Sequence, residues 1–412
     1  MLFEQLAGAP AGMGQEHGVA DRYAQAMELS NAALIPPEIV LEAHLETLAA
    51  PGSGELLSRD CAFRLHRAHY DRQIGGCAFY FGDMSDAAVP TRLGAAEAVL
   101  DHAAALGARE APRLAALTCE DPAWRHCATL ARADFAELLL IVDSSSDAAA
   151  QQRNFVHGRD ECARLVQRPP GWILGLSDRR RFAATPAGRA RVGALLEGLV
   201  PAVDGVYLLP LLLAGESGTV ERASGCELLF GMLAEQLAEA GLRRTAPGLY
   251  LASDRLHRTA GAPLLLRLLA SQRNGDYIGV GPLAVSRIDR VRFRNWAETS
   301  TYRDGIDTRG HGIAQSWTPT AHETLCTELL AALALGETVD LRSLAARHQL
   351  TRPAYLEQLQ RCSATLAELG AVRRLGNLTL CVPAASDVHF ARLVATLDTL
   401  RTRIDAVTLR LV

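Results

Sequence analysis

The sequence predicts an α/β protein in which parallel strands form a partial or full barrel, and three observations support this prediction. Short apolar runs alternate with helix-like segments of about 10–15 residues, the pattern of βαβ units in a parallel sheet. A chain of 412 residues, 49% of them hydrophobic, is long enough to bury at least one large core. The pattern changes at both ends of this region, which indicates smaller appended modules.

The predicted strands are apolar runs separated by helical stretches. They are CAFRLH (61–66), CAFYF (77–81), LAALT (114–118), ELLLIV (137–142), GWILGL (171–176), GVYLLPLLL (205–213) and GLYLAS (248–253). The predicted helices between them include 92–106, 187–199 and 224–240. Functional side chains in such sheets lie at the C-terminal ends of the strands, so residues just after these runs are the candidates for a site.

The N-terminal part is predicted to be a helical extension over residues 1–55. Residues 19–50 carry helical periodicity, interrupted at Pro36 and Pro37. The barrel is predicted over residues 56–310.

The C-terminal part is predicted to be a winged-helix-like module over residues 318–385, followed by one amphipathic helix over 386–412. Three helical stretches precede a hairpin that turns at Gly376 and Asn377, which is the element order of a winged helix. Because the chain is net acidic, we interpret this module as a packing or dimerisation unit rather than a DNA reader.

The composition excludes several classes of function. The net charge of -4 gives no electrostatic signal for nucleic acid or an anionic membrane. Every basic residue is arginine, so neither a pyridoxal phosphate Schiff base nor a P-loop lysine is available. The sequence has no apolar run long enough to span a membrane and no signal-peptide pattern. Its nine scattered cysteines contain no C-x-x-C pair, which favours reduced thiols and a cytoplasmic location.

Residues 274–306 carry the most specific pattern. There D-Y-x-G-x-G-x-x-A-x-S is followed by R-x-x-N and a tyrosine. This segment resembles a motif of oxygen-independent coproporphyrinogen III oxidase and its relatives in the radical SAM superfamily, which include haem chaperones. The resemblance implies a radical-SAM-type (β/α) barrel and covers roughly residues 56–385. Weaker matches in the same order lie at LTCEDP (117–122), GWILGLSDRR (171–180), YLLPLLLAGESGT (207–219) and GLRRTAPGLYLASDRLHRTAG (241–261).

The sequence departs from that family where the cofactors bind. The family motif Y-x-H-I-P-F-C-x-x-x-C-x-x-C holds a [4Fe–4S] cluster through three thiolates. In the nearest stretch, residues 63–77, His66 falls at the family histidine, Tyr70 and Ile74 replace two cysteines, and Cys77 alone is left. The G-G-T-P loop that grips S-adenosylmethionine is replaced by AAVPT (87–91). We therefore expect neither the cluster nor S-adenosylmethionine.

Polar residues near the predicted strand ends are the candidate site. The candidate catalytic residues are carboxylates: Glu120, Asp143, Asp178 and Asp254. The candidate cofactor-binding residues are His66, His69, Tyr70 and His257, and the three histidines are also the candidate metal ligands. They could hold non-haem iron or zinc, or one of them could be an axial ligand of a haem. Alternatively the H-x-x-H of His66 and His69 is loop structure, because its spacing is loose.

Three functions remain open from the sequence. The first is an enzyme in which a metal or haem replaces the cluster, performing a redox tailoring step in bacterial specialised metabolism. The resemblance makes N–N bond formation a concrete case, as in the diazeniumdiolate amino acid graminine built from arginine for siderophores. The second is a non-catalytic haem or tetrapyrrole carrier, and the third is a pseudo-enzyme subunit of a catalytic partner. The expected partners are a small molecule, arginine-derived or tetrapyrrole, and either a second copy of the chain or a partner enzyme.

Overall fold

One large sheet dominates the structure, which is a computed structural model. The residues that it describes are 39–48, 52–66, 73–118, 126–143, 146–167, 170–177, 185–208, 231–246, 248–252, 265, 276–289, 291–334, 337–368, 370 and 372–381. The strands of this sheet are β1 (Ile39–His44), β2 (Ile74–Asp83), β3 (Arg113–Thr118), β4 (Glu137–Asp143), β5 (Gly171–Ser177), β6 (Gly205–Tyr207), β7 (Leu242–Ala246), β8 (Leu249–Ala252), β9 (Asp276–Val280), β10 (Val285–Ile288), β11 (Val291–Asn295) and β12 (Ile313–Trp317).

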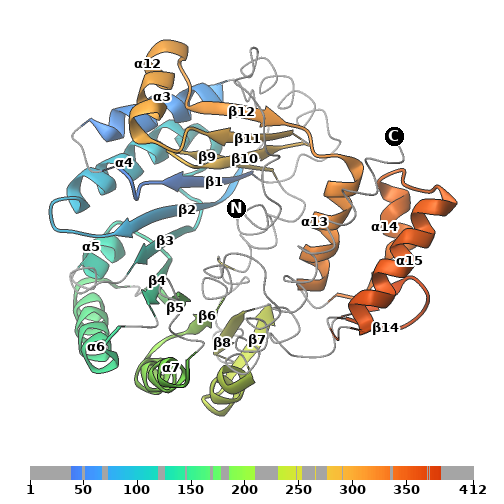
Figure 1. Cartoon of the computed structure of the whole chain (residues 1–412). Coiled ribbons are helices and arrows are strands. Elements are labelled where there is room, and N and C mark those ends of the chain that lie inside the picture. Colours follow the sequence, from blue (N-terminus) through green and yellow to red (C-terminus); the bar gives the residue numbers. More distant parts are fainter. Residues whose placement is uncertain are drawn as a thin grey trace.

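The strand order is β12-β11-β10-β9-β1-β2-β3-β4-β5-β6-β8-β7. The central strands from β9 to β6 are parallel, and antiparallel strands extend both edges. The sheet curves strongly, and β12 and β7 remain its two edges within the described residues (Figure 1). The predicted fold class is confirmed as a mixed α/β fold with a curved parallel sheet, and the barrel is partial.

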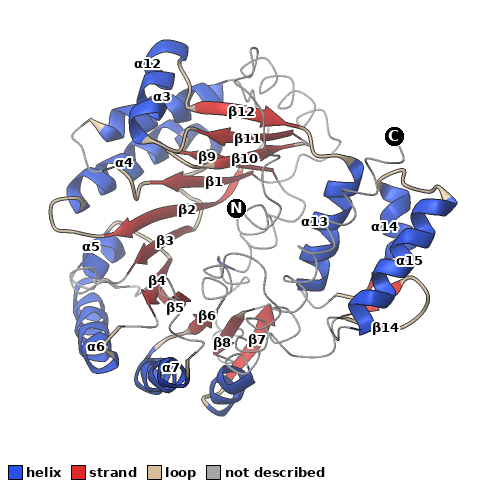
Figure 2. Cartoon of the chain, in the orientation of Figure 1, coloured by secondary structure: helices blue, strands red, loops and turns tan. Residues whose placement is uncertain are grey.

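Helices cover the convex face of the sheet (Figure 2). They are α3 (Ser53–His66), α4 (Val89–His102), α5 (Cys127–Arg132), α6 (Ala148–Leu165), α7 (Pro186–Leu199) and α12 (Thr299–Arg309), with short 3₁₀ turns at Ala104–Leu106 and Val200–Ala202. Alternate strand residues point to this layer, for example Leu41, Phe79, Leu117, Leu140 and Leu174. The convex side therefore holds one large apolar core.

The concave face of the sheet points towards the C-terminal helices (Figure 1). These elements are α13 (Ala321–Ala334), α14 (Leu341–Arg347) and α15 (Pro353–Glu368), with a small sheet of β13 (Val339–Asp340), β15 (Thr379–Cys381) and β14 (Arg373–Arg374). Val40, Leu114 and Ile173 on the concave face belong to the same apolar cluster as Leu325 and Leu329 of α13. The C-terminal elements are thus continuous with the core on the concave side.

The predicted strand over 61–66 is wrong, because these residues form the second half of α3. Leu57, Cys61, Arg64 and Leu65 are buried at helical spacing, which puts them on one face of a helix against the sheet. The other predicted runs fall on β2, β3, β4, β5, β6 and β8 where the structure describes them.

The segment Ile39–His44 is a second correction. We predicted it to be part of the helical extension, but it is the strand β1. It pairs in parallel with β2 on one side and β9 on the other, and all six of its residues are buried. Residues 1–38 of the predicted extension and the predicted C-terminal helix, 386–412, lie outside the described residues. No helix in the described part of the chain is long and apolar enough to cross a membrane.

Candidate functional site on the concave face

Polar side chains of β1 occupy the concave face near the C-terminal ends of the parallel strands. Strand residues alternate between faces, and Leu41 and Ala43 of β1 lie in the convex core. Glu42 and His44 therefore point to the concave side, where they are 1% and 3% exposed. A buried glutamate and a buried histidine two residues apart are unusual in a central strand, because burying such groups costs free energy.

A carboxylate orients the imidazole of His44. Nδ1 of His44 lies 3.0 Å from Oε1 of Glu46, and a carboxylate oxygen accepts, so Nδ1 carries the proton. In the neutral imidazole, Nε2 then has the free lone pair. This atom is buried and has no hydrogen-bond partner among the described residues. A carboxylate-oriented imidazole with an open Nε2 is the arrangement of a general base or of a ligand to a metal or haem iron.

Two tyrosines complete this group. Tyr80 lies opposite His44 on β2, and the two rings stack with their centroids 4.7 Å apart. Burial raises the pKa of Tyr80 well above its ordinary value, and the charges of Glu42 and Glu46 raise it further. Burial also raises the pKa of Tyr207, at the end of β6, above its usual range. Both phenols therefore stay neutral and are available as hydrogen-bond donors.

The curvature of the sheet brings these residues to one place. Tyr207 contributes to the raised pKa of Tyr80, although β3, β4 and β5 lie between their two strands in the sheet. Tyr80 packs against the concave-side cluster that contains Tyr207. We define the concave-face site as Glu42, His44, Glu46, Tyr80 and Tyr207.

Arg92 of α4 fixes the loop that carries Glu46. Its guanidinium, 6% exposed, donates to the backbone oxygens of Glu46 (2.6 Å) and Leu48 (3.4 Å). It also donates to the oxygens of Phe81 (2.5 Å) and Asp83 at the end of β2. The loop after β1 is thus tied to β2 by charge-assisted hydrogen bonds. This clamp holds the backbone from which Glu46 reaches His44.

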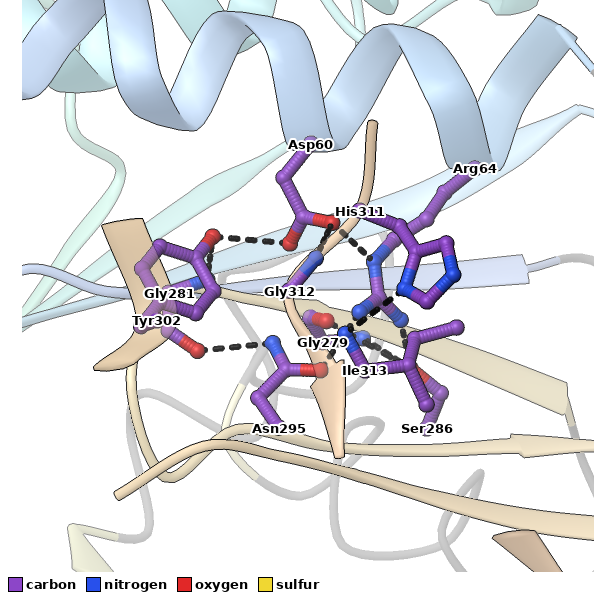
Figure 3. Close-up of polar contacts among 10 residues, drawn as sticks. All are labelled: Asp60, Arg64, Gly279, Gly281, Ser286, Asn295, Tyr302, His311, Gly312 and Ile313. Atoms are coloured by element: carbon purple, nitrogen blue, oxygen red, sulfur yellow. Dashed lines mark hydrogen bonds and ion pairs between the residues drawn. The ribbon is translucent and has the colours of Figure 1, made fainter. Parts of the chain in front are cut away.

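The segment that carries the coproporphyrinogen oxidase resemblance forms a different polar cluster, between α3 and the edge strands (Figure 3). Nε of Arg64 lies 3.2 Å from Oδ1 of Asp60 with both side chains fully buried. Arg64 also donates to Oγ of Ser286 (2.8 Å) and to Oδ1 of Asn295 (2.5 Å). Ser286 and Asn295 come from the motif in 274–306, so one α3 arginine binds two motif residues.

The same cluster positions the backbone of the motif. Tyr302 donates its hydroxyl to Oδ2 of Asp60 (2.7 Å) and accepts from the backbone N of Gly281 (3.0 Å). Nδ2 of Asn295 donates to the oxygen of Gly281 (2.7 Å), and Gly312 donates to Asp60 (3.0 Å). These contacts are internal to the protein. We interpret the motif as a structural device that attaches α3 and β9–β12 to β1.

The predicted site residues fall mainly outside the described residues. Glu120, Asp178 and Asp254 do so, and so do His69, Tyr70 and His257. Asp143 is the last residue of β4 and is partly buried, at the strand end where we predicted it. His66 ends the helix α3 rather than a strand, so our assignment of it to the first strand end is wrong.

Sequence reasoning missed the concave-face site because 19–50 was interpreted as helical. A signal was nevertheless present: Glu42, His44 and Glu46 recur at every second position in an otherwise apolar run. Period-two polarity predicts a strand with one polar face. The histidine that ends the first strand of the sheet is thus His44, not His66.

Comparisons with known proteins identify the fold. No family model matches the sequence, and no curated protein matches it. Among solved structures, coproporphyrinogen III oxidase from Escherichia coli, a radical SAM enzyme, matches with a TM-score of 0.63 at 12% identity, covering 92% of this chain and 93% of that chain. The chain has the coproporphyrinogen oxidase fold. At this identity the match establishes the fold and not the activity.

Within the described residues, the cysteines around β1 are not suited to hold the iron–sulfur cluster expected of the coproporphyrinogen oxidase fold. Eight residues, LETLAAPG (45–52), connect β1 to α3, and none of them is cysteine. Two described thiols, Cys61 in α3 and Cys77 in β2, are fully buried in the convex core and donate to backbone oxygens. Burial raises the pKa of Cys77 to about 12 and raises that of Cys61 too, whereas cluster ligands are thiolates.

We expect anaerobic reconstitution with iron and sulfide to leave the protein without a cluster. The measurement is iron and acid-labile sulfide per chain, together with the visible absorption spectrum, on the desalted protein. Retention of about four irons and four sulfides per chain would show that other cysteines hold a cluster. The matched variant Cys77→Ala should behave like the wild type in this assay.

Proposed function

We propose that this chain is an enzyme that uses the coproporphyrinogen oxidase fold without its iron–sulfur cluster. Its small-molecule substrate would bind against the concave face of the sheet, at His44. The observation that carries the proposal is the buried Nε2 of His44, oriented by Glu46 and without a hydrogen-bond partner among the described residues. Buried polar atoms in proteins are almost always satisfied by protein groups, water or a ligand, and a ligand is the partner that we propose for this atom.

The neighbouring groups define what such a site could do. Nε2 of His44 can accept a proton or donate its lone pair to iron. The phenols of Tyr80 and Tyr207, kept neutral by burial, can donate hydrogen bonds to an oxygen of the substrate. One base and two neutral donors on three strands suit a substrate with an acidic proton close to an anionic or carbonyl oxygen.

The proposed cofactor is a haem or a non-haem iron in place of the cluster, with Nε2 of His44 as a protein ligand; a non-haem iron would need further ligands from outside the described residues. Either group would supply one-electron chemistry to a redox tailoring step. N–N bond formation on an arginine-derived siderophore building block is the proposed step. It rests on the resemblance of the sequence to coproporphyrinogen-oxidase-like proteins, and the described residues carry no feature specific to that substrate.

A haem or tetrapyrrole carrier is the second candidate function. A haem iron takes only one or two protein ligands, whereas zinc or iron held by protein side chains takes three or four. Within the described residues no group of three or more His, Cys, Asp or Glu side chains is placed to hold a metal ion. His44 alone would serve as the axial ligand of a haem. By its name, the Escherichia coli protein acts on coproporphyrinogen III, a tetrapyrrole.

We expect the His44→Gln variant to lose haem or iron binding. The measurement is haemin titration of the purified protein, followed by the Soret band, with metal analysis of the protein as isolated. Removing the ligand should weaken binding by at least about 100-fold, and Glu46→Gln should weaken it by about 10-fold, since the group that orients a ligand typically contributes 10–100-fold.

His126→Gln is the matched control, because His126, the N-cap of α5, is paired with Asp86 and neither residue belongs to the concave-face site. It should bind like the wild type. If wild type and His44→Gln bind haem and iron equally well, His44 is not the ligand. The role of partner subunit would then be favoured.

A further inference from the structure

Two cysteines, a histidine and a tyrosine lie together in the C-terminal helices. His322 and Cys326 are one turn apart on α13, and Tyr355 and Cys362 lie on α15. His322 is 8% exposed, whereas Cys326, Tyr355 and Cys362 are partly exposed. None of these residues belongs to the concave-face site, and the chemistry proposed for that site does not use them.

The polar contacts in this group link Tyr355 to His322 and His322 to Cys326. The hydroxyl of Tyr355 lies 2.6 Å from Nδ1 of His322, and the rings meet edge to face. Nε2 of His322 lies 3.5 Å from Sγ of Cys326. A thiol, a base within hydrogen-bond reach and a third group that orients the base are the parts of an activated nucleophile.

Burial keeps Tyr355 a neutral partner of His322. Burial is the main cause that raises the pKa of Tyr355 above its usual range, and Cys326 and Cys362 raise it further. Tyr355 therefore stays a neutral phenol that orients His322 without adding a charge. Burial also raises the pKa of Cys362, so that residue stays a thiol. Cys362 is thus a natural comparison for Cys326 in the same module.

We propose that Cys326 is a reactive thiol and a site of oxidation by hydroperoxides, with His322 as its base. Nε2 of His322 takes the thiol proton, and the thiolate sulfur attacks one peroxide oxygen. An S–O bond forms and the O–O bond breaks. The sulfur is oxidised to sulfenic acid, the peroxide is reduced, and the departing hydroxide takes the proton from His322 to leave as water. Partial exposure of Cys326 gives a small oxidant access to the sulfur.

The test uses hydrogen peroxide on the full-length protein, with dimedone to trap sulfenic acid. Because the chain has no lysine, trypsin cleaves only at arginine, and peptides 310–342 and 362–373 each carry one cysteine. Mass spectrometry therefore reports Cys326 and Cys362 separately within one sample. We expect Cys326 to be labelled at least about tenfold faster than Cys362 at neutral pH, the scale that a positioned base contributes.

His322→Gln should reduce the labelling of Cys326 to the rate of Cys362, and Tyr355→Phe should reduce it by a smaller factor. His348→Gln, whose histidine pairs with Glu328 of α13 in the same module, should leave it unchanged. Equal labelling of the two cysteines in the wild type would overturn the proposal. So would unchanged labelling of Cys326 in His322→Gln. If that variant does not fold, the comparison within the wild type and the Tyr355→Phe variant decide the question.

Discussion

Arg64→Met is expected to lower the free energy of unfolding by about 3–5 kcal/mol, because it leaves the carboxylate of Asp60 buried without its counter-charge. Arg64 and Asp60 are both 0% exposed, and Arg64 also donates to Ser286 and Asn295. A methionine fills much of the same volume but supplies none of these donors. The measurement is urea denaturation of the purified variant beside the wild type.

Two variants separate the buried charge from other causes. Arg59→Met removes an arginine from the same helix, and the ion pair of Arg59 with Asp307 is half exposed. This substitution should therefore lower the free energy of unfolding by less than about 1 kcal/mol. The double variant Asp60→Asn with Arg64→Met removes both charges and should be more stable than Arg64→Met alone. A loss below about 1 kcal/mol for Arg64→Met would mean that the cluster in Figure 3 does not hold α3 to the sheet.

Gly281→Ala is expected to lower the free energy of unfolding by about 3 kcal/mol or more, through backbone strain and a clash together. Gly281 has φ +100°, a conformation that residues with a Cβ rarely adopt. A Cβ at this position would lie 2.3 Å from the backbone oxygen of His44. The strand β1 would have to move, and with it the imidazole of the concave-face site.

Gly310→Ala is the matched control for this prediction. Gly310 ends α12 with φ +80°, but a Cβ there would meet no atom within 4 Å. This substitution should lower the free energy of unfolding only by the strain of the left-handed conformation, about 1 kcal/mol. Thermal and urea unfolding of both variants give the comparison. An equal loss of unfolding free energy in the two variants would show that the close contact between Gly281 and β1 does not contribute to stability.

The Gly281 contact connects the structural motif to the candidate site. Gly281 is held by Tyr302 and Asn295 and packs against the backbone of His44. On the other side, Arg92 holds the loop that carries Glu46. The His44–Glu46 pair is therefore fixed by two buried arrangements that lie outside the site itself. We expect ligand binding at His44 to be sensitive to variants in both.

The sequence alone predicted the main elements of the sheet, because each depends on short-range patterns. The runs at β2, β3, β4, β5 and β8 are apolar stretches of strand length separated by helical segments. The motif in 274–306 identified the fold family, and the comparison with the Escherichia coli structure supports that fold. The missing cysteine motif is also a property of the sequence, independent of how the chain folds.

Tertiary structure decided between two competing local signals at β1, and so which histidine ends that strand. Leu41, Glu42 and Ala43 are good helix formers, so local preference did not predict a strand over Ile39–His44. That strand forms because β2 and β9 satisfy its backbone hydrogen bonds on both sides, and β9 is far away in the sequence. The same long-range pairing sets Tyr80 beside His44, and Tyr80 packs against the concave-side cluster that contains Tyr207. No local sequence pattern relates these residues, because they become neighbours only in the folded sheet.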